Sequence, residues 1–184
     1  MERFSDDVRA VVLTISDRCS AGTRDDVSGP TVVRILQAAG VQEPLRAILP
    51  DETGEIAHAL RHYAADADLI LTTGGTGLAP RDVTPEATRL VCDRLVEGLS
   101  ERMRAAGLAE TPMAALSRGI CGCLGRTLVM NLPGSPAGAE TSLKAVIGLL
   151  PHALQLLAGH TEHQTESTQA EGRQAVATHG GGKD

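Results

Sequence analysis

Short apolar runs alternate with amphipathic segments along the first half of the chain. Nearly continuous apolar residues predict strands at residues 10–15, 45–49 and 68–72. The segments between and after these strands carry apolar residues three or four positions apart, the spacing of one helix face. They predict one helix that begins at Gly29-Pro30 and stops at Gly40, and a second that follows residues 50–53. A third helix is predicted from Pro85 to about residue 95, with Thr84 as its N-cap.

The remaining segments are less regular. Residues 16–28 form a polar loop, and residues 97–117 predict two short helices around Gly107 and Pro112. A fourth strand is predicted at residues 127–131, followed by a helix over residues 137–159 that is interrupted near Gly148 or Pro151. Beyond His160 the residues become small and polar, so we expect one domain over residues 1–163 and a disordered tail over residues 164–184.

The order of these elements predicts an α/β fold with three layers. Apolar strands that alternate with helices are typical of a mostly parallel central sheet with helices on both faces. Such sheets bind ligands outside the carboxyl ends of their strands. This rule places Ser16 and Asp17, Asp51, and the loop over residues 72–82 along one rim of the predicted sheet.

Composition narrows the classes of partner. The 184 residues carry a net charge of −6 and include, of Phe, Tyr and Trp, only Phe4 and Tyr63, so no basic or stacking surface for nucleic acid is expected. No apolar stretch has membrane-spanning length and the first residues lack the apolar core of a signal peptide, which favours a cytoplasmic protein without a membrane partner. The four cysteines lack the spacing of a metal site and are expected to be ordinary thiols.

The most informative segment is the run from Thr73 to Gly77, with Asp82 shortly after it. The run follows a predicted strand and contains three glycines and two hydroxyl groups. Glycines let backbone N–H groups approach a ligand closely, so this position at the end of a strand predicts an anion site. Asp82 adds a carboxylate, which suits an anion site that also holds a divalent cation.

Common catalytic motifs can be tested against the chain. It has no G-x-x-x-x-G-K-[ST] motif and no G-x-S-x-G elbow, and Pro80 occupies the last glycine position of a dinucleotide fingerprint. His58 and His62 lie four residues apart without the Glu of a zinc hydrolase, so a solvated face is expected for both. Asp51 and Asp82 remain, and two carboxylates without a neighbouring histidine fit metal-assisted transfer of a phosphoryl or nucleotidyl group.

Each candidate also has a purely structural interpretation. Local sequence alone favours Asp51 as a cap of the following helix, and Asp82 has the position of a residue that bonds its own turn. For Asp82 we favour a functional role, because two prolines and three glycines surround it in sequence. The structural interpretation of Ser117 is a helix end, and that of Asn131 is a turn after its strand. For Asp17 and Asp26 it is a solvated position in a loop.

Seven short motifs occur in order along the chain. They are Ser16-Asp17-Arg18, Asp26-x-Ser28-Gly29, Pro50-Asp51-Glu52, Thr73-Gly-Gly-Thr-Gly77, Arg81-Asp-Val-Thr-Pro85, Leu116-Ser117-Arg118 and Asn131-Leu-Pro-Gly134. Together they resemble the molybdenum-cofactor biosynthesis family, and within it the molybdopterin adenylyltransferase group that includes bacterial MogA and the G domain of gephyrin. One such motif would be a weak indication, but seven in order at compatible spacing are specific. The resemblance extends from about Val8 to about His160.

The resemblance implies a reaction and a set of site residues. The expected fold is the molybdenum-cofactor-binding α/β domain, as a homotrimer, with a molybdenum-insertion enzyme of the same pathway as a further partner. The expected reaction is attack of the molybdopterin phosphate on ATP, with Mg²⁺, to give adenylylated molybdopterin and pyrophosphate. Asp51 and Asp82 are the expected catalytic residues and hold Mg²⁺-ATP. The expected substrate-binding residues are Ser16, Asp17, Thr73, Gly74, Gly75, Thr76, Gly77, Ser117, Asn131, Pro133, Gly134 and Ser135, with the glycine run on phosphates or adenylate and Ser117 and Asn131 on the pterin.

Three other interpretations remain open. A MoaB-type protein would share the fold and bind molybdopterin with little or no transfer, although the presence of both Asp51 and Asp82 favours the enzyme. The related domain of the molybdenum-insertion branch lies within a much longer chain. CinA-like nucleotide hydrolases are also usually longer, so length disfavours both of these last interpretations.

Overall fold

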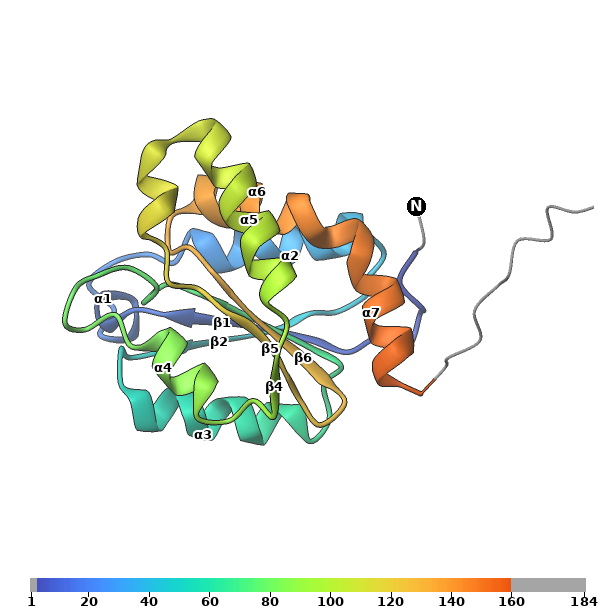
Figure 1. Ribbon diagram of the computed structural model, residues 1–184. Coiled ribbons are helices and arrows are strands. Elements are labelled where there is room, and N and C mark those ends of the chain that lie inside the picture. Colours follow the sequence, from blue (N-terminus) through green and yellow to red (C-terminus); the bar gives the residue numbers. More distant parts are fainter. Residues whose placement is uncertain (1–2, 160–184) are drawn as a thin grey trace, which may run out of the picture.

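A mostly parallel sheet connects the strands. The computed structural model describes residues 3–159 of the chain. Its strands are β1 (Ala10–Ile15), β2 (Leu45–Leu49), β3 (Leu69–Thr73), β4 (Arg94–Leu95), β5 (Cys121–Leu124) and β6 (Thr127–Leu132). Within the described residues they form one six-stranded sheet in the order β2-β1-β3-β6-β5-β4 (Figure 1). β2, β1, β3 and β6 run parallel, and β5 is antiparallel to both its neighbours, which confirms the predicted α/β class.

Helices cover both faces of this sheet, as predicted. They are α1 (Asp17–Ser20), α2 (Ser28–Ala38), α3 (Thr53–Ala64), α4 (Thr84–Arg89), α5 (Glu97–Glu110), α6 (Pro136–Val146) and α7 (Leu150–Leu157), with the 3₁₀ helices η1 (Pro112–Leu116) and η2 (Ile147–Leu149). α3 and α4 pack on one face, whereas α2, α5, α6 and α7 pack on the other (Figure 1). This arrangement leaves the strand ends, rather than the faces, open to ligands.

Alternating strand residues supply two hydrophobic cores. Val12, Leu71 and Met130 are buried beneath α2, α5, α6 and α7. Their neighbours Ile70 and Val129 are buried against α3 and α4. Successive strand residues point to opposite faces, so a strand covered on both sides needs an apolar residue at nearly every position. This requirement explains why β1, β3 and β6 are visible as apolar runs in the sequence.

The antiparallel end of the sheet differs from the sequence prediction. The helix predicted from Pro85 to about residue 95 ends at Arg89, and β4 and β5 occur where no strand is predicted. β5 has the sequence Cys-Gly-Cys-Leu and β4 has two residues, so neither shows a hydrophobic period. Backbone pairing decides the structure here, since the Asp93 N–H donates to the Cys123 carbonyl group (2.8 Å).

Two local predictions are also corrected. Thr84 is the first residue of α4 and not its N-cap, because its hydroxyl group donates to the carbonyl oxygen of Gly74 (2.9 Å). The two helices predicted around Gly107 and Pro112 are one long helix, α5, followed by η1. Gly107 lies inside α5, where a Cβ atom would come within 2.8 Å of the Ala114 Cβ. Close packing against η1 therefore explains this glycine, and no helix end is present there.

The C-terminal elements agree with the sequence. β6 is the fourth predicted strand, and the predicted helix over residues 137–159 is divided into α6, η2 and α7 near Gly148 and Pro151. The predicted domain boundary at residue 163 and the predicted tail over residues 164–184 lie outside the described residues. Within residues 3–159, no helix combines the length and apolar character that crossing a membrane requires.

The tight fit at Gly122 in β5 predicts an effect on stability. A Cβ atom there would lie 2.7 Å from the Arg94 carbonyl oxygen and 2.8 Å from the Cys92 sulfur, so Gly122→Ala overpacks this edge. We expect the free energy of unfolding to fall by about 1–3 kcal/mol in urea denaturation. Gly98→Ala in α5 is the matched control, because the added Cβ would meet no atom within 4 Å and alanine favours a helix. Equal stability of the two variants would contradict the prediction.

Candidate active site

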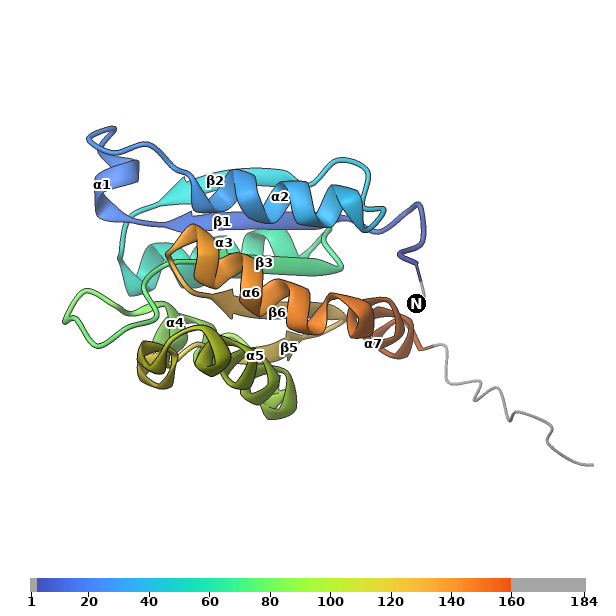
Figure 2. The ribbon, with the colours of Figure 1, turned by 90° about the horizontal axis from the view of Figure 1, so that it is seen from above.

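Four parallel strands bring their carboxyl ends to one rim. β1 is followed by Ser16 and Asp17, β2 by Asp51, and β3 by the glycine loop, defined here as residues 74–82. The connection after β6, residues 133–135, completes the rim. Figure 2 shows α1 and the glycine loop at the end of the sheet that is remote from the N-terminus. The structure therefore brings together the segments that strand order predicts to be neighbours.

The polar connection after β1 is more ordered than the sequence predicts. It contains α1, which the Ser16 hydroxyl caps by accepting a hydrogen bond from the Cys19 N–H (3.3 Å). The interpretation of Asp26 as a solvated residue is wrong, because its side chain is only 4% exposed. The Asp26 carboxylate accepts hydrogen bonds from the Thr14 hydroxyl (2.8 Å) and the Gly29 N–H (2.9 Å). This carboxylate thus joins β1 to the first turn of α2.

The glycine loop is held by close backbone contacts. Gly74 and Gly75 have φ angles of 105° and 62°, in the left-handed region that favours glycine. A Cβ atom on Gly74 would lie 2.2 Å from the Ile15 carbonyl oxygen, and one on Gly75 would lie 2.3 Å from the Thr84 hydroxyl. Thr84 fastens the turn, since its hydroxyl donates to the Gly74 oxygen (2.9 Å) and its N–H to the Gly75 oxygen (3.0 Å). The conformation of this loop is therefore set before any ligand binds.

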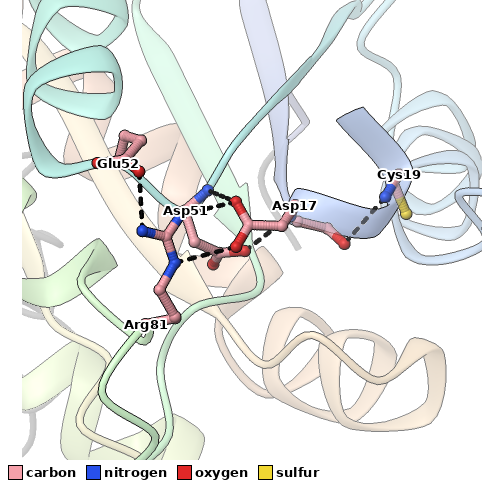
Figure 3. Close-up of polar contacts among 6 residues, drawn as sticks. Asp17, Cys19, Asp51, Glu52 and Arg81 are labelled. Atoms are coloured by element: carbon pink, nitrogen blue, oxygen red, sulfur yellow. Dashed lines mark hydrogen bonds and ion pairs between the residues drawn. The ribbon is translucent and has the colours of Figure 1, made fainter. Parts of the chain in front are cut away.

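Arg81 joins three connections through one guanidinium group (Figure 3). Its Nε and Nη2 atoms donate to the two carboxylate oxygens of Asp17 (3.0 and 2.9 Å), and Nη1 donates to Glu52 (2.8 Å). Asp17 and Asp51 exchange two further hydrogen bonds, from the Asp17 N–H to Asp51 Oδ2 (2.8 Å) and from the Asp51 N–H to Asp17 Oδ1 (3.0 Å). The segments after β1, β2 and β3 are thus fixed to one another.

The structural interpretations of the two candidate acids have different outcomes. The cap predicted from local sequence is wrong for Asp51, because Glu52 is the N-cap of α3 and the Asp51 carboxylate accepts from Asp17. The turn interpretation is right for Asp82, whose Oδ2 accepts from the Ala79 N–H (2.8 Å). Both carboxylates nevertheless line one cavity, which keeps the functional interpretation of the pair.

Negative charge accumulates on this rim. Burial raises the pKa of the Asp51 carboxyl group, and the charges of Asp17 and Asp82 raise it further. The pKa of Asp17 is lowered, mainly because Arg81 donates hydrogen bonds to it. The same hydrogen bonds raise the pKa of Arg81. Arg81 therefore neutralises Asp17, while Asp51 and Asp82 face each other's charge at a position where a cation would be favourable.

Two cavities meet at the glycine loop. The first, named here the carboxylate cleft, has a volume of about 580 Å³, within the range of small-molecule sites. It is lined by Asp51 and Asp82 and also by Arg18 and Arg24. Carboxylates suit a hard cation such as Mg²⁺, and arginines suit phosphate oxygens. This combination of side chains fits a metal–polyphosphate ligand.

The second cavity lies among α5, η1 and α6 and is named here the helical cleft. Its volume is about 510 Å³, and it combines apolar residues such as Met103 with polar residues such as Ser100 and Arg104. The Ser100 hydroxyl is the one buried side-chain polar atom in the described part of the chain that has no hydrogen-bond partner. A mostly apolar pocket with a few polar groups is typical of sites for a small organic ligand.

The two cavities share one wall, and every predicted site residue lines at least one of them. Gly75, Asp82, Gly134 and Ser135 line both cavities. The carboxylate cleft also contains Ser16, Asp17, Asp51, Thr73 and Gly74, whereas the helical cleft also contains Thr76, Gly77, Ser117, Asn131 and Pro133.

Several of these residues also stabilise the site. Asn131 is buried, and its Nδ2 donates to the hydroxyl groups of Thr72 (3.0 Å) and Thr88 (2.9 Å). It therefore links β6 to β3 and α4, a wider role than the turn considered from sequence. Ser135 caps α6 by accepting from the Gly138 N–H (3.2 Å).

Among the cavity residues that the sequence prediction does not include are Ser100, Arg104 and Arg24. Ser100 and Arg104 lie four positions apart and so share one face of α5. Their sequence indication is two polar residues next to the buried Leu99 and Met103 on the same helix. Arg24 has no comparable indication, because it belongs to an irregular segment without a hydrophobic period.

The donor set suits a metal that arrives with its substrate. Within residues 3–159, no group of three or more His, Cys, Asp or Glu residues could hold a metal ion. Mg²⁺ is commonly bound by one or two carboxylates together with substrate phosphates. Asp51 and Asp82 on one cavity fit this second arrangement.

Comparison with protein families identifies the domain to which this fold belongs. The family model MoCF_biosynth, described as "Probable molybdopterin binding domain", matches residues 11–152. The chain belongs to this family. The match contains every residue of the shared wall, so the wall is part of the molybdopterin-binding domain.

Curated relatives in the molybdopterin-binding family align with most of the chain. The molybdopterin adenylyltransferase of Helicobacter pylori (strain J99) is 38% identical over 154 residues, which cover 81% of this chain and 87% of that protein. The molybdenum cofactor synthesis protein cinnamon of Drosophila melanogaster is 42% identical over 149 residues, which cover 79% of this chain. This chain spans 25% of the length of the Drosophila protein.

A solved structure of the molybdopterin-binding family has the same architecture. The molybdopterin biosynthesis enzyme MoaB from Thermus thermophilus is 52% identical and superimposes with a TM-score of 0.75. The alignment covers 83% of this chain and 97% of that chain. The resemblance inferred from seven short motifs is therefore confirmed by sequence and by structure.

The raised pKa of Asp51 predicts a pH-dependent stability gain in Asp51→Asn. The folded protein binds the proton of the Asp51 carboxyl group more tightly than the unfolded chain does. The free energy of unfolding therefore falls as the pH rises from about 4, the unfolded-state pKa, through the higher folded-state pKa. The amide removes the charge, and its oxygen still accepts from the Asp17 N–H. Calorimetry should give a higher Tm than wild type at pH 7, with a difference that shrinks toward pH 4.

Asp17→Asn is the matched control for this measurement. The pKa of Asp17 is lowered by Arg81, so its charge stabilises the folded protein above the unfolded-state pKa. We expect Asp17→Asn to have a lower Tm than wild type at pH 7. A fall in Tm for both variants at pH 7 would contradict the electrostatic picture of the rim.

Proposed function

We propose that this protein is a molybdopterin adenylyltransferase, which transfers the adenylyl group of ATP to molybdopterin and releases pyrophosphate. The observation that carries the proposal is the shared wall, because two cavities of different chemistry meet at Gly75 and Asp82. Group transfer requires two substrates to be held with their reacting atoms in contact. The relative from Helicobacter pylori, aligned over most of both chains, carries the name of this activity.

We assign the carboxylate cleft to Mg²⁺-ATP. Asp51 and Asp82 would hold Mg²⁺ together with the phosphates, and the ion would offset the negative charge of the reacting groups. Arg18 and Arg24 line the same cleft and can donate to phosphate oxygens. Backbone N–H groups of the glycine loop other than those of Gly74, Ala79 and Asp82, which donate within the protein, can add further donors to an anion. These contacts would orient the α-phosphorus toward the shared wall.

We assign the helical cleft to molybdopterin. Ser117 and Asn131, implicated by the family resemblance, line this cleft together with Ser100 and Arg104. The buried Ser100 hydroxyl, which lies within reach of the Cys121 thiol, can also donate a hydrogen bond to a polar ligand in this cleft. Met103 and other apolar residues supply the contacts that aromatic stacking provides in other proteins.

The proposed reaction depends on positioning more than on proton removal. A phosphate group with a second pKa near 6 is ionised at neutral pH, so its oxygen can attack without a general base. A bond forms from that oxygen to the α-phosphorus, and the bond from the α-phosphorus to the bridging oxygen breaks as pyrophosphate leaves. Asp82 lines both cavities, so it lies where the two reacting groups would meet.

An assay with Mg²⁺, ATP and molybdopterin tests the proposed function. We expect the wild-type protein to form adenylylated molybdopterin and pyrophosphate. Asp82→Asn and Asp51→Asn should each lower kcat by about 100- to 1000-fold, as for loss of one preorganised electrostatic group. His58→Ala, at an exposed position of α3 outside both cavities, is the control and should keep full activity.

Each outcome of the assay is informative. Absence of product from the wild-type protein would refute the transferase. Full activity of Asp82→Asn would leave the transferase intact and refute the role given to that carboxylate.

Binding of molybdopterin without transfer is the second candidate function. It is favoured by one observation, since the structure that is 52% identical to this chain carries the name MoaB. Under this alternative, calorimetry would show binding of molybdopterin by the wild-type protein, whereas the assay would show no adenylylated product. Asp51 and Asp82 on a common cavity favour the transferase over this alternative.

Assembly and location complete the proposal. We propose a cytoplasmic homotrimer whose product passes to a molybdenum-insertion enzyme of the same pathway. The family resemblance supports the trimer and the insertion enzyme, and the Drosophila relative carries a similar domain within a longer chain. Sedimentation equilibrium tests the assembly and should give a mass three times that of the 19.1 kDa chain. A monomeric mass at all concentrations would contradict the trimer.

A further inference from the structure

Arg118 contacts the glycine loop and α4 through its guanidinium group. Its Nε donates to the Gly77 carbonyl oxygen (2.7 Å), and its Nη2 donates to the Asp82 carbonyl oxygen (2.5 Å). The remaining nitrogen, Nη1, forms an ion pair with Glu86 of α4. The backbone N–H of Arg118 adds a hydrogen bond to the Thr76 carbonyl oxygen (2.9 Å). One side chain thus holds both ends of the segment from Gly77 to Asp82.

The unit between these two anchors, residues 77–82, also has hydrogen bonds of its own. The Asp82 carboxylate accepts from the Ala79 N–H (2.8 Å), and the Asp82 N–H donates to the Ala79 carbonyl oxygen (2.9 Å). Leu78, in the same unit, is 65% exposed, so core packing contributes little to its position. The location of the Asp82 carboxylate therefore depends on polar contacts, which are the anchors by Arg118 at the ends of the segment and the ion pairs of Arg81 within it.

The anchor is built from the side of the helical cleft. Ser117 and Gly119, on either side of Arg118 in sequence, both line that cleft. Asp82, which the Arg118 side chain holds through the backbone, lines both cavities. A ligand of the helical cleft and the Asp82 carboxylate are therefore placed by the same short stretch of chain.

We propose that Arg118 is a positioning residue, which fixes the Asp82 carboxylate for adenylyl transfer by holding the carbonyl groups of Gly77 and Asp82. The kinetic part of this proposal rests on the proposed function, whereas the structural part does not. Arg118 acts through the main chain of the glycine loop and makes no contact with the reacting atoms. Its loss should therefore misplace a catalytic group without removing it.

Arg118→Lys and Arg118→Met test the kinetic part. Lysine keeps the charge but lacks the planar group that reaches three acceptors, and methionine keeps only an aliphatic chain. In both variants kcat should fall about 100-fold, the effect of a misplacement near 1 Å, while KM for ATP and for molybdopterin stays unchanged. Glu86→Gln is the matched control, because it removes the ion pair and leaves both carbonyl contacts. Its kcat should stay within about fivefold of wild type.

Amide hydrogen exchange measured by mass spectrometry tests the anchor without the reaction. In Arg118→Lys, peptides over residues 75–84 should exchange faster than in the wild-type protein. Peptides from β1, β3 and β6 should exchange at the wild-type rate, which separates local loosening from general destabilisation. Glu86→Gln should resemble the wild-type protein over residues 75–84.

The outcomes distinguish this proposal from the proposed function. Unchanged exchange over residues 75–84 in Arg118→Lys would overturn the positioning role. A higher KM for ATP with an unchanged kcat would also overturn it, because it would indicate direct binding. If the wild-type protein gave no product while Arg118→Lys still loosened residues 75–84, the proposed function would fail and the anchor would stand.

Discussion

The close packing of the glycine loop against the ends of β1 and β6 is the constraint on which the site depends. A Cβ atom on Gly74 would lie 2.2 Å from the Ile15 carbonyl oxygen, and one on Gly134 would lie 3.1 Å from the Gly74 Cα. Three segments therefore meet backbone to backbone. This contact brings the two cavities together at the residues that line both of them. Group transfer needs reacting atoms about 3–3.5 Å apart, so the two ligands would have to meet beside these shared residues.

Two arginines hold this wall from opposite directions. Arg81 extends from the glycine loop to Asp17 and Glu52, whereas Arg118 extends from the end of η1 to the main chain of the loop. Isolated ion pairs at a protein surface contribute little stability. A planar guanidinium group that donates to several acceptors restricts the relative position of the segments it joins more than a single ion pair does. The arginines therefore act as orienting groups, and the acids that they leave for a ligand are Asp51 and Asp82.

The parallel part of the fold was predictable, and the contacts between distant segments were not. β1, β3 and β6 are covered on both faces and must be apolar at nearly every position, whereas β5 contains a central glycine and has no period to detect. The rim positions follow from strand order, and the family motifs selected residues that each line at least one of the two cavities. The local sequence around Asp51 suggests a helix cap because its true partner, Asp17, lies 34 residues away. The anchoring by Arg118 is hidden for the same reason.

The two-residue length of β4 has a consequence for solubility. A long exposed edge strand offers unpaired N–H and C=O groups to other molecules and promotes aggregation. β4 presents little such backbone, and its exposed residue Arg94 places a charge where a second strand would have to pair. The antiparallel hairpin that closes this side of the sheet therefore also discourages edge-to-edge association. Substitutions that extend β4 or neutralise Arg94 would expose the sheet to aggregation without altering either cavity.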